Sequence, residues 1–217
     1  MAILLRPDQE KIKESNNRKI LHLLMKKREM SKQTIAGETC LTVPTVTNNI
    51  NHLIEEGIVE EAGVSVSTGG RKPMLIRFLP QSRHAFGVDF SSNHLTSSSC
   101  IRVILIDFDA VIKQEVDFDY QDFDNIDEIM KHVRMLTEKM IKNLRIPVER
   151  ILGIGFSLPG TVNERKKVLE LAPNLSPDLG MKDLHFKKYE SLFPFPPCLS
   201  FSEPGYRRRY CCAGTYL

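Results

Sequence analysis

Several features that define other protein classes are missing from this sequence. No run approaches the roughly 20 apolar residues that a membrane-spanning helix needs, and the apolar start of MAILLRPDQE is too short for a secretory signal peptide. The five cysteines have no spacing typical of a zinc site, and no histidine is placed to complete one. We therefore expect a reduced, cytoplasmic protein with no metal, no cofactor and no membrane partner.

The net positive charge is also small, and it is unevenly distributed. The 217 residues are 41% hydrophobic and 26% charged, which is typical of a globular protein, and the formal net charge is only +3. The first 80 residues carry 12 Lys/Arg and 9 Asp/Glu, whereas residues 81–217 carry 18 of each. All the excess positive charge thus lies in the N-terminal third, as expected if that third meets phosphates.

Three helices are predicted within the first 57 residues. The first runs from about Asp8 to Met30, and Ser31 is a typical N-cap for a short second helix. After a break at residues 39–41, Thr42 caps a third helix that Gly57 ends. The predicted inner faces consist of Ile12, Ile20, Leu21, Leu23, Leu24 and Met25 on the first helix, Ile35 and Ala36 on the second, and Val43, Val46, Ile50, Leu53 and Ile54 on the third.

Two short β-type runs follow, over residues 58–62 and 74–78, with GVSVSTGGRKP between them. Three helices followed by a hairpin with a basic tip predict a winged helix-turn-helix domain over residues 1–80. In such a domain the second helix of the motif lies in the major groove, where side chains that both donate and accept hydrogen bonds read the base edges.

The residue types on the third helix fit that role. Its exposed side carries hydroxyls and amides, and no Lys or Arg occurs between Gln33 and Gly70, so phosphate contacts must come from the first helix, Lys32 and the wing. Two glycines before Arg71 would let the wing approach a narrow A·T-rich minor groove. The alternative is a polar helix beside an ordinary turn. The candidate DNA-binding residues are Ser31, Lys32, Gln33, Thr42, Thr45, Thr47, Asn48, Asn51, Gly69, Gly70, Arg71 and Lys72.

The pattern changes after the connector LPQSRH. FGVDF, IRVILIDFDA and residues 113–118 are β-type, residues 125–144 form an amphipathic helix, and ILGIGFSLPG indicates a buried strand that ends in a turn. This β-β-β-α-β order is typical of the first half of an α/β nucleotidase-like domain, which we place at residues 85–192. From Phe193 the pattern is lost, and residues 193–217 are predicted to be an irregular tail.

The stretch from SKQTIAGE to GGRKP resembles the DNA-binding domain of the ROK family (repressors, open reading frames, kinases), in particular its xylose-repressor-type regulators, and the likeness continues through GVDFSSN, GIGFSLPGTVN and LAPNL. It implies an α/β protein overall, a winged helix-turn-helix followed by the first lobe of an actin/hexokinase-like sugar-binding domain. It also implies a double-stranded DNA partner, a sugar effector, and repression of carbohydrate-utilisation genes such as those for xylose. Gly160 and Asn174 match segments that border the family's sugar cleft, although each also fits a simple turn or cap.

Departures from the family pattern shape the functional expectation. In the helix-turn-helix turn, Cys40 stands where the family commonly has Gly. In the second domain, Asp89 is followed by Phe90 and SSN, whereas the family's kinases have a Gly- and Thr-bearing phosphate loop there. The absence of those glycines from this segment favours a non-enzymatic sensor. The ending, CLSFSEPGYRRRYCCAGTYL, does not continue the family pattern, so we expect a truncated sugar domain with impaired sugar sensing and impaired homo-oligomerisation. A ROK-type sugar kinase and a non-functional fragment remain the alternatives.

Overall fold

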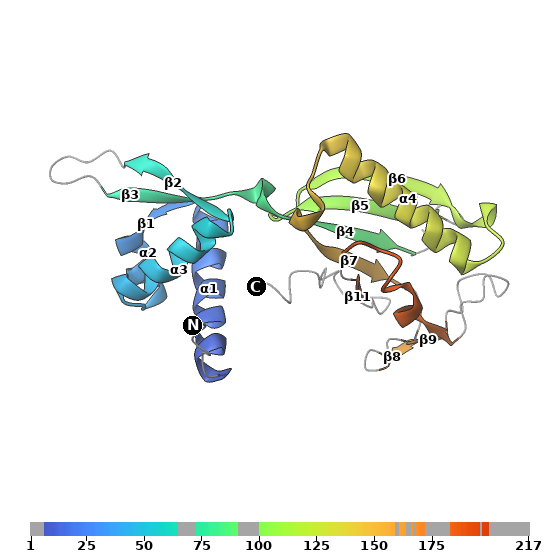
Figure 1. Ribbon diagram of the computed structural model, residues 1–217, viewed down its shortest axis with the longest axis horizontal. Helices are drawn as coiled ribbons and strands as arrows, with labels where there is room; N and C mark the ends of the chain where they lie inside the picture. The colour runs from blue at the N-terminus through green and yellow to red at the C-terminus, as the bar shows by residue number, and fades with distance from the viewer. Residues whose placement is uncertain are drawn as a thin grey trace, which may run out of the picture. The chain divides into compact units, whose positions relative to one another are not determined.

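The computed structural model describes residues 7–64, 73–90, 100–158, 161–163, 166, 168–171, 183–195 and 197–199. The protein is a mixed α/β protein, and its described residues divide into two compact units on either side of the bond between Ser82 and Arg83 (Figure 1). Each unit has its own sheet and its own buried apolar residues.

The first unit combines helices with an antiparallel three-stranded sheet of order β1-β3-β2. Its elements are α1 (Pro7–Lys27), β1 (Glu29–Ser31), α2 (Lys32–Thr39), α3 (Val43–Glu55), β2 (Val59–Val64), β3 (Met74–Phe78) and the 3₁₀ turn η1 (Pro80–Ser82). The helix α3 contacts α1, α2 and β2. Three helices, one strand ahead of the helix-turn-helix and a β2–β3 hairpin make the winged helix-turn-helix arrangement that the sequence predicts.

Both helices of the motif begin with the same local device. Ser31 Oγ accepts a hydrogen bond from the Thr34 N–H at 3.1 Å, and Thr42 Oγ1 accepts one from the Thr45 N–H at 3.3 Å. Each cap satisfies a backbone donor that the first helical turn leaves without an intrahelical partner. The two caps fix where α2 and α3 start, and so set the turn between them.

The ends of the two helices both need left-handed backbone. Gly57 has φ 66°, and the Gly57 N–H to Ile54 and Ile58 N–H to Leu53 hydrogen bonds, at 2.8 and 2.9 Å, form the paired closure of a Schellman motif. The helix α2 ends at Cys40, with φ 56°. A side chain in this region costs on the order of 1 kcal/mol, because Cβ approaches the following carbonyl, so Cys40 is a strained residue in the helix-turn-helix turn.

The core of the first unit lies where the three helices meet the sheet. Its buried apolar residues are Ile20, Leu21, Leu24, Met30, Ile35, Ala36, Val46, Ile50, Leu53, Ile58, Val59, Ile76 and Phe78. Two residues assigned to the inner faces are instead exposed: Ile12 by 60%, because the α1 side chains before Ile20 are not buried, and Val43 by 43%, because the buried face of α3 starts only at Val46. The predicted first helix is also too long, since Arg28 turns left-handed (φ 72°) and Glu29 enters a strand that the sequence pattern did not indicate.

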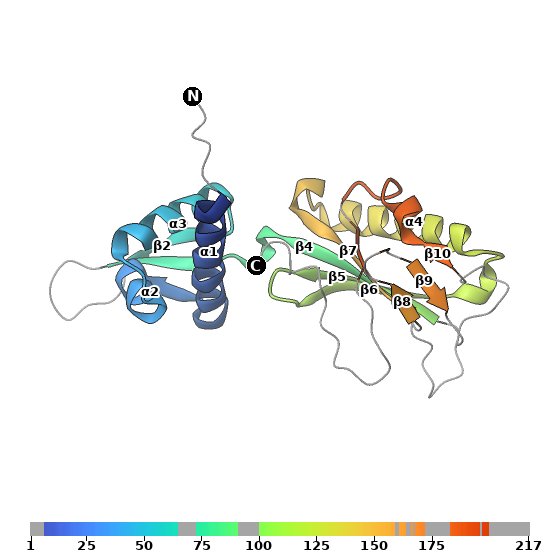
Figure 2. The ribbon, with the colours of Figure 1, turned by 90° about the horizontal axis from the view of Figure 1, so that it is seen from below.

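The second unit is built on a five-stranded sheet of order β11-β7-β4-β5-β6. Strands β4, β5 and β6 form an antiparallel meander, and β7 and β11 add in parallel on the other side of β4. The helix α4 lies across one face of this sheet (Figure 2). The elements are β4 (His84–Asp89), β5 (Cys100–Asp107), β6 (Ile112–Asp119), η2 (Tyr120–Asp122), α4 (Ile126–Leu144), η3 (Val148–Arg150), β7 (Ile151–Ser157) and β11 (Pro197–Leu199).

The core of this unit joins the inner face of α4 to alternate residues of the strands. Ile129, Met130 and Val133 are fully buried within the same cluster as Val103 and Phe156. Asn125 caps α4 by accepting a hydrogen bond from the Glu128 N–H at 3.1 Å. The observed β-β-β-α-β order is the one the sequence predicts for the start of this unit.

A small second sheet and the start of the predicted tail differ from expectation. The strands β8 (Thr161–Asn163), β9 (Val168–Leu171) and β10 (Leu184–His185) pair in the order β10-β9-β8, and η5 (Phe186–Tyr189) follows. The tail was predicted to be irregular from Phe193, but Phe193 and Phe195 are buried and β11 pairs with β7. The prediction fails there because the two rings, separated by a proline, stack on each other and Phe195 stacks on Phe86, with no periodicity to reveal it. Residues 200–217 lie outside the described part.

Within the described part of the chain, no helix combines the length and apolar character that crossing a bilayer requires.

Candidate nucleic-acid interface

The outer face of α3 is polar and uncharged along most of its length. Asn48 and Asn51 are exposed, Thr47 is half-buried, and the opposite side of the helix is held in the core by Val46, Ile50 and Leu53. An exposed Asn can donate and accept hydrogen bonds at the same time, as the edge of adenine in the major groove requires. The fold therefore presents both amides outward on a rigid, capped helix.

Three other candidate residues are partly used by the fold itself. The hydroxyl of Ser31 is buried and serves as the cap of α2, and it also lies 2.8 Å from the Thr34 hydroxyl. Thr42 is exposed, but its hydroxyl caps α3 and lies 2.8 Å from that of half-buried Thr45. These hydroxyls are positioned mainly by the helix ends. A role for them in DNA contact stays a prediction.

The basic and amide residues at the start of α2 lie beside the sheet. Lys32 Nζ is 3.6 Å from Glu61 Oε1 on β2, so this lysine has a carboxylate partner within the domain, while Gln33 is exposed. Because both side chains of the Lys32–Glu61 pair are partly solvated, the pair is worth little to stability. A phosphate could compete with the carboxylate for the lysine.

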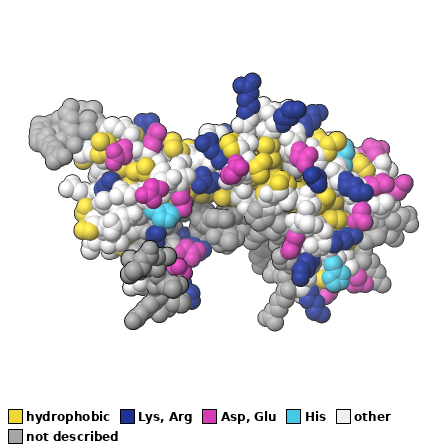
Figure 3. All heavy atoms as spheres, viewed as in Figure 1, with side chains coloured by type: hydrophobic (Ala, Val, Ile, Leu, Met, Phe, Trp, Pro, Cys, Tyr) yellow, Lys and Arg dark blue, Asp and Glu magenta, His cyan; other side chains and the backbone are white. Residues whose placement is uncertain are grey.

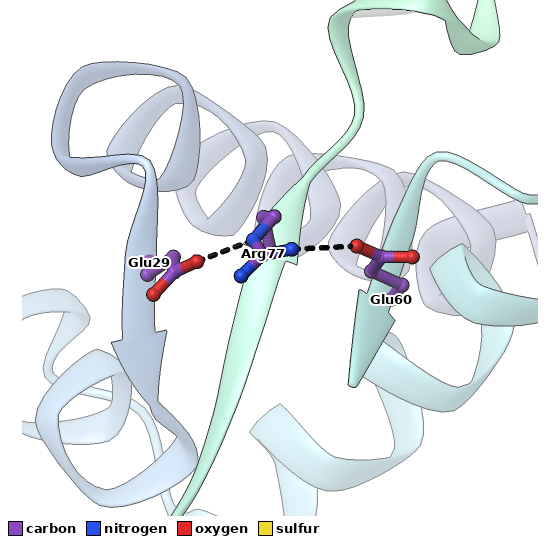
Figure 4. A network of polar contacts seen from close by, with 3 residues as sticks. All are labelled: Glu29, Glu60 and Arg77. Atoms are coloured by element: carbon purple, nitrogen blue, oxygen red, sulfur yellow. Dashed lines mark hydrogen bonds and ion pairs between the residues drawn. The ribbon is translucent and has the colours of Figure 1, made fainter. Parts of the chain in front are cut away.

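The sequence analysis did not single out Arg77, which ties the three strands of the first unit together. Its guanidinium donates to Glu29 on β1 and to Glu60 on β2, the second at 3.2 Å (Figure 4). The hydrogen bond to Glu29 is the main cause that raises the pKa of Arg77 above its ordinary value. Arg77 pairs in register with both glutamates, which is the signal that could have found it once β1 was known. This arginine is a cross-strand clamp at the base of the wing.

The predicted wing-tip residues Gly69, Gly70, Arg71 and Lys72 lie outside the described residues, as do the predicted sugar contacts Gly160 and Asn174. Their roles stay predictions. The described strands β2 and β3 carry the two ends of the wing, with Val64 paired to Met74.

Polar residues of the second unit are held in structural pairs. Lys113 lies 2.8 Å from buried Asp107, which also accepts from the Asp109 and Val111 N–H groups at 2.9 and 3.0 Å in the β5–β6 turn. Burial alone would raise the pKa of Asp107, but the Lys113 and backbone hydrogen bonds together lower it. Arg102 makes a two-pronged contact with Asp117 across β5 and β6, 2.8 Å for each bond. These carboxylates stabilise turns and strand pairs.

A third polar cluster fastens η5 to the start of α4. The Tyr189 hydroxyl donates to Asp127 Oδ1, and Lys188 Nζ lies 2.8 Å from the same oxygen. The hydrogen bond from Lys188, which has the largest influence, and that from Tyr189 lower the pKa of Asp127. Among the described residues no group of three or more His, Cys, Asp or Glu is arranged to hold a metal ion.

The burial of two residues of α3 decides which side chains the interface can offer, and one of them, Val43, differs from the sequence expectation. Val43, assigned to the core, is exposed at the start of the helix. Asn49, which follows Asn48, is buried, and its Nδ2 donates to the Thr45 carbonyl at 2.7 Å. Of the three asparagines between positions 48 and 51, the fold therefore offers only Asn48 and Asn51 to a partner.

Comparison with known proteins agrees with this geometry. Residues 14–60 match the family model described as winged helix-turn-helix DNA-binding. The chain is 30% identical over 186 residues to a putative xylose repressor of Caldicellulosiruptor sp. (strain Rt8B.4), covering 85% of this chain and 44% of that protein. It is 24% identical over 183 residues to the xylose repressor of Bacillus spizizenii, covering 84% and 44%. The chain thus spans less than half the length of these curated relatives.

A solved structure of a ROK family transcriptional regulator, a homologue of the Escherichia coli MLC protein, has the same fold with a TM-score of 0.63 at 15% identity, covering 88% of this chain and 46% of that one. The fold and the exposed face of α3 define the class: a winged helix-turn-helix DNA-binding module followed by an α/β domain. Over the part that it spans, the chain is similar in sequence to these xylose repressors and in fold to this ROK-family regulator.

Proposed function

We propose that the protein is a sequence-specific DNA-binding transcription regulator that represses genes for carbohydrate use. The observation that carries the proposal is the outer face of α3, where exposed Asn48 and Asn51 stand on a capped helix without a charged neighbour before Glu55. An ordinary solvated helix has charged side chains there. The xylose repressors among the relatives support the repressor role.

Base contacts and phosphate contacts come from different elements of the first unit. The part of α3 from Val43 to Asn51 enters the major groove and reads base edges through Thr47, Asn48 and Asn51. Lys26 and Lys27, both exposed in the last turn of α1, and Lys32 contact phosphates, which fix register and set the salt dependence. Arg71 of the wing inserts into an adjacent A·T-rich minor groove.

The second unit is proposed to take part in sugar sensing, with Gly160 and Asn174 as contacts to a sugar effector. A homo-oligomer would place two recognition helices on two half-sites of the operator. The protein acts without a catalytic step and in the cytoplasm.

The test is a selection from a pool of randomised duplexes with the full chain, followed by titration of the selected duplex at 50 and 200 mM salt. We expect one duplex family to be enriched, and the logarithm of affinity to fall with the logarithm of salt concentration by about 0.9 per phosphate contacted. Asn48→Ala should relax preference at one base pair by about 1–3 kcal/mol. Asn143→Ala, the same change at an exposed position of α4, is the matched control and should leave preference unaltered.

The competing functions give different results in the same preparation. A ROK-type sugar kinase would turn over ATP when one sugar of a panel is added, whereas a regulator would not. A non-functional fragment would enrich no duplex and turn over no ATP. Sugar-dependent ATP turnover or the absence of any enriched duplex would overturn the proposal.

A further inference from the structure

The recognition helix α3 begins with an apolar side chain that the fold leaves open. Val43 is the first residue of the helix and is 43% exposed, and Pro44 beside it is exposed as well. The core of the first unit takes its first α3 side chain at Val46. Val43 and Pro44 thus form an exposed apolar end on a helix face that continues with hydroxyl and amide side chains.

The position of Val43 sets where its methyl groups point. The Cα–Cβ bonds of a helix tilt toward its N-terminus, so the side chain of a first-turn residue projects beyond the end of the helix. Thr47 lies one turn later on the same edge, at the i+4 position. Because valine is branched at Cβ, few rotamers are lost when it is fixed against a partner.

The charges on α3 indicate which end approaches DNA more closely. Exposed Glu55 is the last residue of α3, and Glu56 follows as its C-cap, whereas Val43–Asn51 carries no charge. Phosphates repel carboxylates, and the N-terminal end of a helix dipole is positive. Both effects favour the Val43 end of α3 entering the major groove of the DNA. They keep the C-terminal end, with Glu55 and Glu56, away from the DNA phosphates.

In the major groove, thymine is distinguished by an apolar group, its C5-methyl, which apolar side chains contact. We infer that Val43 is a specificity-determining residue that packs on the C5-methyl of a thymine in the operator, next to the base pairs that Asn48 and Asn51 read. This inference rests on the proposed function and deepens it, because it assigns one apolar position of the recognition site.

The experiment compares Val43→Ala, Val43→Thr and the control Val148→Ala on the duplex selected by the full wild-type chain. Val148 lies in the second unit and is similarly exposed, at 38%, so the control removes the same two methyl groups away from the interface. In each duplex variant one thymine is replaced by deoxyuridine, which removes only the C5-methyl. Thermal melting of each protein variant verifies that it is folded.

The wild-type protein should lose about fourfold in affinity when one particular thymine becomes deoxyuridine, the factor that corresponds to burial of one methyl group. Val43→Ala should bind the thymine duplex more weakly by a similar factor and be insensitive to deoxyuridine at that position. Val43→Thr, which keeps one methyl group, should retain part of the sensitivity, and Val148→Ala should behave like the wild type.

Two outcomes would overturn the inference, and they are distinguishable. If a duplex is selected but folded Val43→Ala keeps both its affinity and the wild-type response to deoxyuridine, Val43 does not read thymine although the protein still binds DNA specifically. If no duplex is selected at all, the proposed function fails and the inference fails with it.

Discussion

The helices α3 and α4 are built alike on the inside and differently on the outside. Each begins at a capping side chain, Thr42 or Asn125, and each buries one apolar face. The exposed face of α4 carries charged residues along its length, with Arg134 paired to Glu138 at 2.8 Å. The exposed face of α3 carries threonines and asparagines, and its first charged residue is Glu55.

This difference separates a helix that faces water from one suited to a partner. Charged side chains of both signs are scattered over the face of the second unit that Figure 3 shows, as expected of a solvated surface. An uncharged amide face adds little to solubility, but it can donate and accept hydrogen bonds in a confined groove. The comparison therefore predicts that equivalent changes on the two helices have equal effects on stability and unequal effects on DNA binding.

The largest effect should come from the inner faces, where the two helices are alike. Ile50→Ala on α3 and Ile129→Ala on α4 each remove a fully buried side chain, and each should cost about 2–5 kcal/mol of local stability. Hydrogen exchange of peptides from each helix measures this directly. Lys131→Ala on the exposed face of α4 is the control and should change protection little. A cost for Ile50→Ala well below 1 kcal/mol would mean that α3 is not anchored as a rigid reading helix.

The next largest effect should appear in DNA binding, where equivalent changes on the outer faces of α3 and α4 should have unequal consequences. Asn48→Asp should weaken binding to the selected duplex by about 10- to 100-fold, because it removes a donor from the base edge and adds a charge that phosphates repel. Asn143→Asp makes the same chemical change on an exposed position of α4 and should leave binding unaltered. Fluorescence anisotropy with labelled duplex measures both. Equal losses for the two variants would point to a general charge effect and remove Asn48 from the reading face.

The helix caps should give a smaller effect that sharpens the comparison. Thr42→Ala and Asn125→Ala each remove a side-chain acceptor for a first-turn N–H, and each should destabilise its helix by about 0.5–2 kcal/mol. Hydrogen exchange of each helix, measured at increasing denaturant concentration, gives the loss of stability. Thr42→Ala should also weaken DNA binding, whereas Asn125→Ala should not, and Thr42→Ser should restore both properties.

The helical part of the first unit could be predicted because its signals are local. Ser31, Thr42, Pro44 and Gly57 mark the helix ends by capping and backbone preference, and the helices fall where these residues place them. The strand β1 was missed because three residues carry no readable alternation, and its existence depends on pairing with β3 far along the chain. The Glu29–Arg77–Glu60 clamp was missed with it.

Burial at the helix ends could not be predicted from periodicity. Val43 has the spacing of a core residue, but at the first position of α3 no neighbouring element covers it. Asn49, which the sequence analysis left out of the candidate DNA-binding residues, faces inward, and its Nδ2 donates to the Thr45 carbonyl. Which side chains reach a partner is decided by tertiary packing, while the helix itself is decided by caps and pattern.

The smallest effect concerns the pH dependence of stability in the second unit, in whose described residues two histidines, His84 and His132, are buried or half-buried. Burial lowers the pKa of His84 and of His132, and the His132 ring packs against Phe118 and Phe123 at 4.7 and 5.0 Å between ring centroids. An unfolded histidine takes up a proton near pH 6.5, above the lowered pKa of the folded form. Protonation thus favours the unfolded state, and the stability contributed by the neutral rings is full above pH 6.5 and falls as the pH drops below it.

Melting temperature measured between pH 7.5 and 5.0 should therefore decrease toward acid for the wild type. His132→Phe keeps an aromatic ring beside Phe118 and Phe123 and has no titrating group, so its melting temperature should depend less steeply on pH. The lowered pKa values of Asp107, Asp117 and Asp127 affect stability only at more acidic pH, because an unfolded aspartate is protonated near pH 3.9. An unchanged pH slope in His132→Phe would show that another group carries the dependence. A wild type that gains stability toward pH 5 would contradict the assignment of neutral, desolvated histidines to this unit.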